Sequence, residues 1–101
     1  MLTPKQKVYL RSLAQKIKPT FQIGKEGLSD NLLRDVNNYL KKHELMKISI
    51  LQNSLVEKED CEEFFIKDGI EFVQAIGRVI VLYKHSDTVK DPIKLHIKNS
   101  K

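Results

Sequence analysis

The feature that most constrains this chain is a short apolar run that leads through a Gly-x-x-Gly loop into an amphipathic helix, at residues 21–29 and beyond. Gly24 and Gly27 remove side-chain bulk from both sides of a turn, so the backbone can approach a ligand closely. The helix start that follows favours an anion, and Lys25, beside Glu26 between the glycines, adds a mobile positive charge. Because most Gly-x-x-Gly sequences are plain turns, the loop alone leaves a structural turn and a phosphate site both open.

Three segments have the apolar spacing of amphipathic helices. The first begins with a capping box and a proline at residues 3–6, and Pro19 ends it, because the residue before a proline is pushed out of helical geometry. The second starts after the cap residue Ser29 and runs to about residue 43. The third covers residues 56–68, and Gly69 closes it as a C-cap.

The β-branched runs predict strands at residues 20–23, 45–51, 71–76 and 78–83. The last two runs flank Gly77, and we expect residues 75–78 to form the turn between them, so that both strands are shorter than the runs. The order α-β-α-β-α-β-β predicts an α/β fold, with one compact domain over residues 1–85 in which helices pack on a small mixed sheet. Residues 86–101 are polar, and we expect them to form a flexible C-terminal tail.

Charge is segregated along the chain. The formal net charge of +5 and the pI near 9.4 favour a polyanionic partner. Residues 1–50 carry a net charge of +6, residues 51–69 carry −4, and residues 70–101 carry +3. An acidic segment between two basic ones predicts that one face of the domain is basic and another is not.

The residue types do not assemble a catalytic centre. His43, His85 and His96 share no metal-ligand spacing with one another or with Cys61. No serine stands in a nucleophile-elbow context, and neighbouring carboxylates of the third predicted helix point apart. We therefore expect a protein that is not an enzyme and that uses no metal, cofactor or small-molecule substrate.

The single cysteine and the N-terminus indicate the compartment. Cys61 excludes an internal disulfide, and its acidic neighbours favour a raised thiol pKa and a role as a small core residue. No stretch reaches membrane-spanning length, and the N-terminus lacks the apolar run of a signal peptide. We expect a protein of the reducing cytoplasm that does not contact membranes.

Basic residues of several predicted elements are candidates for contacts with nucleic acid. Lys7 and Arg11 fall together beside the apolar stripe of the first helix, and Lys18 continues the row, which is either a phosphate-tracking edge or a solvated flank. Gly-x-x-Gly loops clamp nucleotide backbone in KH domains. The candidate RNA-binding residues are Gly24, Lys25, Glu26, Gly27, Lys7, Arg11, Lys18, Arg34, Arg78 and Lys84.

Four ordered blocks resemble a known family. They are Lys-Gln-Lys-x-Tyr-Leu-Arg-x-Leu-Ala at 5–14, Pro-x-Phe-Gln-Ile-Gly-Lys-x-Gly-Leu at 19–28, His-Glu-Leu-x-Lys-Ile at 43–48 and Val-Gln-Ala-Ile-Gly-Arg-Val-Ile-Val-Leu-Tyr-Lys at 73–84. Together they resemble stand-alone bacterial YhbY-type proteins, the single-domain form of the CRM (chloroplast RNA splicing and ribosome maturation) domain. The resemblance covers roughly residues 2–84.

This resemblance implies a fold like the C-terminal domain of translation initiation factor 3, a KH-like glycine loop and association with precursor large ribosomal subunits. Two departures from the family pattern stand out. Lys84 follows the tyrosine where the family usually has arginine, which puts a bidentate phosphate contact there in doubt. The segment 57–68 is more acidic than expected for the family and argues against RNA contact on the third helix.

The main hypothesis is therefore a monomeric RNA-binding protein that contacts the backbone of ribosomal RNA during large-subunit assembly. The alternative is a small protein-interaction adaptor whose acidic third helix meets a basic partner. The two differ in the salt dependence of binding to ribosomal RNA, which is steep only when phosphates are neutralised.

Overall fold

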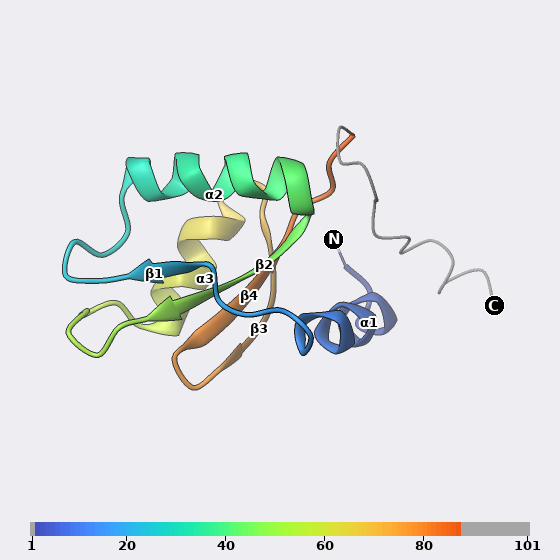
Figure 1. The fold of residues 1–101 in the computed structure, drawn as a ribbon, viewed down its shortest axis with the longest axis horizontal. Helices are drawn as coiled ribbons and strands as arrows, with labels where there is room; N and C mark the ends of the chain where they lie inside the picture. The colour runs from blue at the N-terminus through green and yellow to red at the C-terminus, as the bar shows by residue number, and fades with distance from the viewer. Residues whose placement is uncertain (1, 88–101) are drawn as a thin grey trace.

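The computed structural model describes residues 2–87, which form helices and strands in the predicted order (Figure 1). The elements are α1 (Pro4–Ala14), β1 (Phe21–Ile23), α2 (Asp30–His43), β2 (Leu45–Ile50), α3 (Lys58–Ile66), β3 (Glu71–Ile76) and β4 (Val79–Tyr83). Most of the predicted tail, from residue 88 onward, lies outside the described residues. The predicted domain boundary at residue 85 stays a prediction.

The strands of the described region form one mixed sheet in the order β1-β2-β4-β3. β1 runs parallel to β2, with Phe21 opposite Ile48, whereas β4 is antiparallel to both β2 and β3. A parallel pair needs a crossover connection, and α2 supplies it (Figure 1). The crossover places the glycine loop at the carboxyl end of β1, where it leads into α2.

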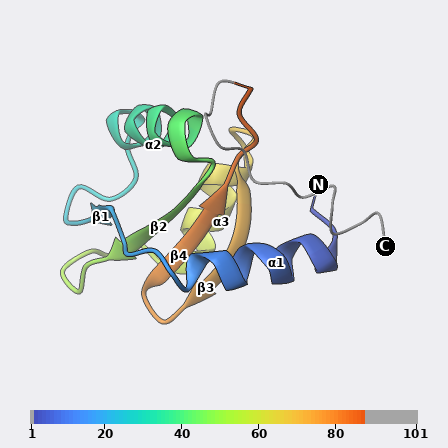
Figure 2. The ribbon, with the colours of Figure 1, turned by 45° about the vertical axis from the view of Figure 1, so that its right-hand side comes forward.

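Helices cover the two faces of the sheet unequally. α2 and α3 cover one face and α1 lies against the other (Figure 2). The core under α2 and α3 is the larger one and includes Val36, Leu40, Met46, Ile48, Cys61, Phe65, Ile80 and Leu82. Under α1, Leu10 and Ala14 belong to a smaller core with Leu45, Val73, Val81 and Tyr83. The predicted α/β architecture with helices packed on a small mixed sheet is confirmed.

The predicted end of the first helix was wrong. α1 ends at Ala14, and the following N–H groups of Lys16 and Ile17 donate to carbonyls only three residues back, at 3.1 and 3.2 Å. This tighter turn ends the helix before Pro19. Lys18 therefore stands outside α1 and does not continue the helical row of Lys7 and Arg11.

The predicted bounds of the third helix and of the β3–β4 turn were also wrong by a few residues. α3 begins at Lys58 because the Asp60 carboxylate accepts the N–H of Glu57 at 3.0 Å, which makes Glu57 its cap residue. The helix ends at Ile66, and Gly69 follows with a left-handed φ of 80°. The β3–β4 turn has only two residues between its strands, with Gly77 at φ 58°, so both strands reach closer to the turn than expected.

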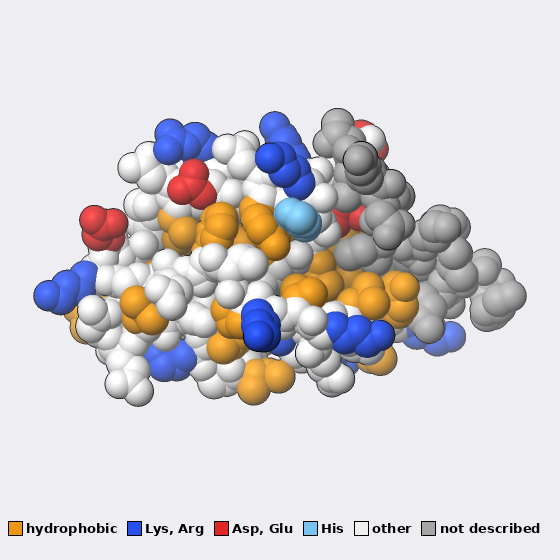
Figure 3. All heavy atoms as spheres, in the orientation of Figure 1, with side chains coloured by type: hydrophobic (Ala, Val, Ile, Leu, Met, Phe, Trp, Pro, Cys, Tyr) orange, Lys and Arg blue, Asp and Glu red, His pale blue; other side chains and the backbone are white. Residues whose placement is uncertain are grey.

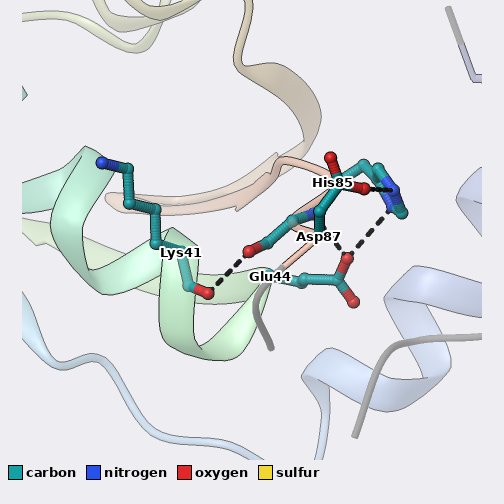
Figure 4. Close-up of polar contacts among 5 residues, drawn as sticks. Lys41, Glu44, His85 and Asp87 are labelled. Atoms are coloured by element: carbon teal, nitrogen blue, oxygen red, sulfur yellow. Dashed lines mark hydrogen bonds and ion pairs between the residues drawn. The ribbon is translucent and has the colours of Figure 1, made fainter. Parts of the chain in front are cut away.

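A buried carboxylate fixes the corner between α2 and β2 (Figure 4). Glu44 adopts a left-handed φ of 65° and is fully buried. Its Oε2 accepts the N–H of Ser86 at 2.7 Å and lies 3.2 Å from Nδ1 of His85. The Ser86 hydroxyl in turn donates to the carbonyl of Lys41 at 2.7 Å. Glu44 thereby ties the segment after β4 to the end of α2.

Replacing Glu44 with alanine should lower the free energy of unfolding by about 2 kcal/mol, because the buried N–H of Ser86 would lose its acceptor. The Glu44→Gln variant keeps a carbonyl oxygen for that N–H and should lose less. Urea unfolding of both variants measures the difference. An alanine variant as stable as the parent would show that this carboxylate does not hold the corner.

Candidate nucleic-acid interface

The glycine loop is a tight turn between β1 and α2. The N–H of Gly27 donates to the carbonyl of Gly24 at 3.0 Å, and Gly27 has a left-handed φ of 69°. A Cβ at Gly27 would lie 3.2 Å from Cγ2 of Val56, so a side chain there meets both strain and crowding. A Cβ at Gly24 would lie 3.6 Å from Cδ1 of Leu51, an ordinary contact. Gly27 is therefore required by the fold, whereas Gly24 has room for a side chain.

The start of α2 lies beside this loop. Ser29 caps the helix, and its hydroxyl accepts the N–H of Leu32 at 3.1 Å, as the sequence predicts. A hollow of about 540 Å³ opens here, and its lining includes Lys25, Glu26 and Asp35. The hollow thus contains one ammonium group, that of Lys25, together with the two carboxylates of Glu26 and Asp35. A phosphate bound here would depend on Lys25 and backbone N–H groups, because the side chains of the hollow do not form a basic patch.

Arg78 connects the β3–β4 turn to the loop after β2. Its Nε donates to the carbonyl of Ile50 at 3.0 Å, and its Nη2 donates to the carbonyls of Leu51 and Ser54 at 2.7 and 3.3 Å. Leu51 also lines the hollow at the glycine loop. Arg78 therefore shapes one wall of that hollow, a role that its predicted contact with RNA did not include.

The basic residues around α1 form the most uniform charge on the surface. Residues 1–25 contain six Lys and Arg residues and no Asp or Glu. Arg11 and Lys18 are exposed and Lys7 is half-buried. In Figure 3 the surface over α1 and the segment leading to β1 shows blue side chains without red ones, whereas blue and red side chains both stand over the glycine loop and α2. The α1 side is the part of the described surface best suited to a polyanion.

Arg34 and Lys84 lie apart from α1. Arg34 is a residue of α2, and Lys84 contacts α2 from the end of β4. Nε of Arg34 is 3.9 Å from a carboxylate oxygen of its neighbour Asp35. Lys84 donates through Nζ to Oδ1 of Asn37 at 3.0 Å, and Nδ2 of Asn37 donates to Asp68 at 2.8 Å. The predicted basic residues therefore do not all share one face, and Lys84 is held in a local network with α2.

The acidic third helix lies on the face opposite α1. Its acidic side chains are exposed, namely Glu57 at the cap, Glu59, Asp60, Glu62 and Glu63, with Asp68 after its end. Cys61 points inward, and burial, helped by the charge of Asp60, raises the pKa of its thiol to about 11. The thiol is therefore protonated at neutral pH and is a poor nucleophile.

The described residues form neither a metal-binding cluster nor a membrane-spanning helix. Residues 2–87 hold no group of three or more His, Cys, Asp and Glu side chains placed to bind a metal ion. Within that range, every helix is too short or too polar to cross a membrane.

Sequence reasoning missed Lys47, on the central strand β2. Lys47 is half-buried and lines a second hollow, between α1 and the sheet, together with Arg11. The available signal was the alternation of β2, in which Lys47 and Ser49 interrupt an apolar strand on the face opposite Ile48.

Comparison with known proteins gives consistent matches. A family model described as the CRS1 / YhbY (CRM) domain matches residues 2–84. The Bacillus subtilis protein named "Probable RNA-binding protein YqeI" is 46% identical over 87 residues, which cover 85% of this chain and 91% of that protein. A Haemophilus influenzae protein named "RNA-binding protein" is 31% identical over 90 residues, which cover 88% of this chain and 91% of the relative.

A plant relative and a solved structure extend these matches. The rice protein "CRS2-associated factor 1, mitochondrial" is 30% identical over 97 residues, but the match covers only 23% of its length. The solution structure of a hypothetical Staphylococcus aureus protein, proposed to bind RNA, matches with a TM-score of 0.72 and 44% identity. That match covers 86% of this chain and 92% of the other.

Arg78→Ala and Arg78→Lys should both lower the free energy of unfolding, by about 1–2 kcal/mol, because a lysine ammonium cannot reproduce the guanidinium fork across three carbonyls. Thermal unfolding measures the loss, and hydrogen exchange of the Ser54 amide reports on the loop. If the Arg78→Lys variant were as stable as the parent and its Ser54 amide exchanged as slowly, a positive charge alone would be sufficient at this position and the three hydrogen bonds of the guanidinium would not be needed.

Proposed function

This chain belongs to the CRS1/YhbY (CRM) domain family, and from that membership we propose that it binds RNA through the α1 side of the sheet and the adjoining glycine loop. The observation that carries the proposal is that residues 1–25 contain Lys and Arg but no Asp or Glu. These residues include α1 and the segment that leads to the glycine loop. Bacterial relatives of similar length are named as RNA-binding proteins.

The charge distribution supports contact with phosphate. Arg11 and Lys18 project from a region without carboxylates, so a polyanion can approach it without like-charge repulsion. Lys25 extends the positive charge to the glycine loop, although Glu26 and Asp35 reduce the attraction there. We therefore assign most of the sequence-independent affinity to the α1 side and a positioning contact to the loop.

The proposed setting is the cytoplasm, where the protein would associate as a monomer with ribosomal RNA of precursor large subunits. The resemblance to stand-alone bacterial family members motivates this assignment. The exposed acidic side chains of α3 favour a second candidate, an adaptor that meets a basic protein partner. Sedimentation of the tagged protein from cell extracts distinguishes the two, because only the first requires co-migration with large-subunit precursors that ribonuclease treatment abolishes.

The glycine loop can be tested at Gly24, because Gly27→Asp would strain the fold itself. Gly24→Asp should weaken RNA binding by about tenfold, since one lost or repelled charge-assisted contact is worth roughly 1.5 kcal/mol. Fluorescence anisotropy with a ribosomal RNA fragment measures the affinity.

Gly24→Ala is the matched control for this test. It adds the same Cβ without charge and should bind more tightly than the aspartate variant. Circular dichroism establishes that both variants are folded. Equal affinity of the alanine and aspartate variants would mean that no phosphate lies at the loop.

Lys7→Ala and Arg11→Ala together should reduce the magnitude of the salt slope of RNA binding by about 1.4–1.8, because each lost phosphate contact contributes roughly 0.7 for single strands and 0.9 for duplexes. Replacing Lys41 and Lys42 at the end of α2 with alanine removes the same charge from another face and should change the slope less. A reduction as large in the α2 variant would point to an interface around α2.

A further inference from the structure

A second hollow, of about 570 Å³, lies on the α1 face of the sheet and is distinct from the hollow at the glycine loop. Leu10 and Ala14 of α1 pack in one cluster with the cross-strand pair Leu45–Tyr83. The part of the sheet nearer the β3–β4 turn is left uncovered. We call the uncovered space the α1 groove.

The α1 groove has a regular construction. Its floor is made by two rows of cross-strand partners, Lys47–Val81–Gln74 and Val79–Ile76. Its wall is one face of α1, where residues 8, 11, 12 and 15 follow each other at helical spacing. The groove is therefore formed by rigid elements.

The chemistry of the lining is apolar, basic and amide-bearing. Val8 and Ile76 are 56% and 67% exposed, so the groove presents apolar surface to the solvent. Arg11 and Lys47 supply positive charge, and none of the described residues that line the groove is Asp or Glu. Gln74 carries both a donor and an acceptor on its side-chain amide.

We propose that the α1 groove binds one unpaired nucleotide of the RNA. The base lies on the apolar side chains of Val79, Val81 and Ile76 with its edge toward Gln74. Its phosphate meets Arg11 and Lys47. Unpaired bases are also recognised by contact of the base face with apolar side chains and by hydrogen bonds to the base edge. The proposal rests on the RNA-binding function proposed above and adds to it a preference for unpaired RNA.

Two observations favour a nucleotide as the occupant. The positive charges of Arg11 and Lys47 lie in the same groove as the apolar side chains of Val79, Val81 and Ile76, which complements the negative phosphate and flat base of a nucleotide. The volume of the groove lies in the range of small-ligand sites. In addition, Pro19 lines the groove and Gly24 lines the loop hollow. Five residues span at most about 18 Å, so one RNA segment can contact both sites.

The test uses two RNA duplexes that differ only in one bulged uridine. The wild-type protein should bind the bulged duplex about fivefold more tightly than the paired one, as expected for one additional hydrogen bond to a base edge. Gln74→Glu places a carboxylate in the groove with almost no change in shape, and it should abolish this preference while binding to the paired duplex persists. Asn38→Asp, the same chemical change on the exposed side of α2, should keep the preference.

Val8→Glu provides a second groove variant on an exposed helical position, in case the strand variant is unstable. In a parallel experiment, 4-thiouridine at the bulge should cross-link to peptides of α1 or of the β3–β4 hairpin. Equal binding of both duplexes by the wild type, or cross-links confined to the glycine loop, would overturn the groove assignment and leave the proposed RNA-binding function intact. The groove would then suit an acidic peptide instead. Failure to bind either duplex would overturn both proposals.

Discussion

The structure depends on β2, a central strand of the described sheet that joins β1 to the other strands and contributes residues to both cores. Met46 and Ile48 are buried under α2 and α3, whereas Leu45 belongs to the core under α1. β2 also pairs in parallel with β1 and antiparallel with β4. Because side chains alternate along a strand, a shift of one residue in β2 would exchange the two faces and expose both cores. This pairing fixes where the candidate RNA contacts lie.

The position of each candidate site follows from β2. Parallel pairing with β1 requires the α2 crossover, so the glycine loop stands at the carboxyl end of β1. Lys47 is directed to the α1 face by the same alternation that buries Ile48 on the other. The two faces then differ in charge, with Lys and Arg around α1 and exposed carboxylates on α3. Such an asymmetry orients the domain toward a polyanion and disfavours docking through α3.

Local signals in the sequence were sufficient for most of the fold. The cap at Ser29 and the left-handed Gly69 depend on residues within one turn of the helix end, and both were identified. The end of α1 was not identified, because the tighter turn formed by the hydrogen bonds of Lys16 and Ile17 depends on the path that the chain takes to β1. Element boundaries set by tertiary geometry are poorly visible in a sequence.

The candidate site was predictable only in part. The Gly-x-x-Gly loop is contiguous, and its position between a strand and a helix could be read directly. Arg78 contacts carbonyls 24 to 28 residues away, so no local pattern indicated its role as a clamp. The same holds for Lys84 and Asn37, which are separated by 47 residues. Their charge suggested RNA, whereas their actual partners depend on the packed sheet.

The central claim is that RNA is bound across α1 and the glycine loop, away from α3. It is tested most directly by following the backbone amides of the protein by nuclear magnetic resonance while ribosomal RNA is added. We expect the largest chemical-shift changes in residues 7–15, 24–29 and 74–79, and small changes for the amides of α3. Shifts concentrated on α3, with α1 and the glycine loop unaffected, would contradict this claim.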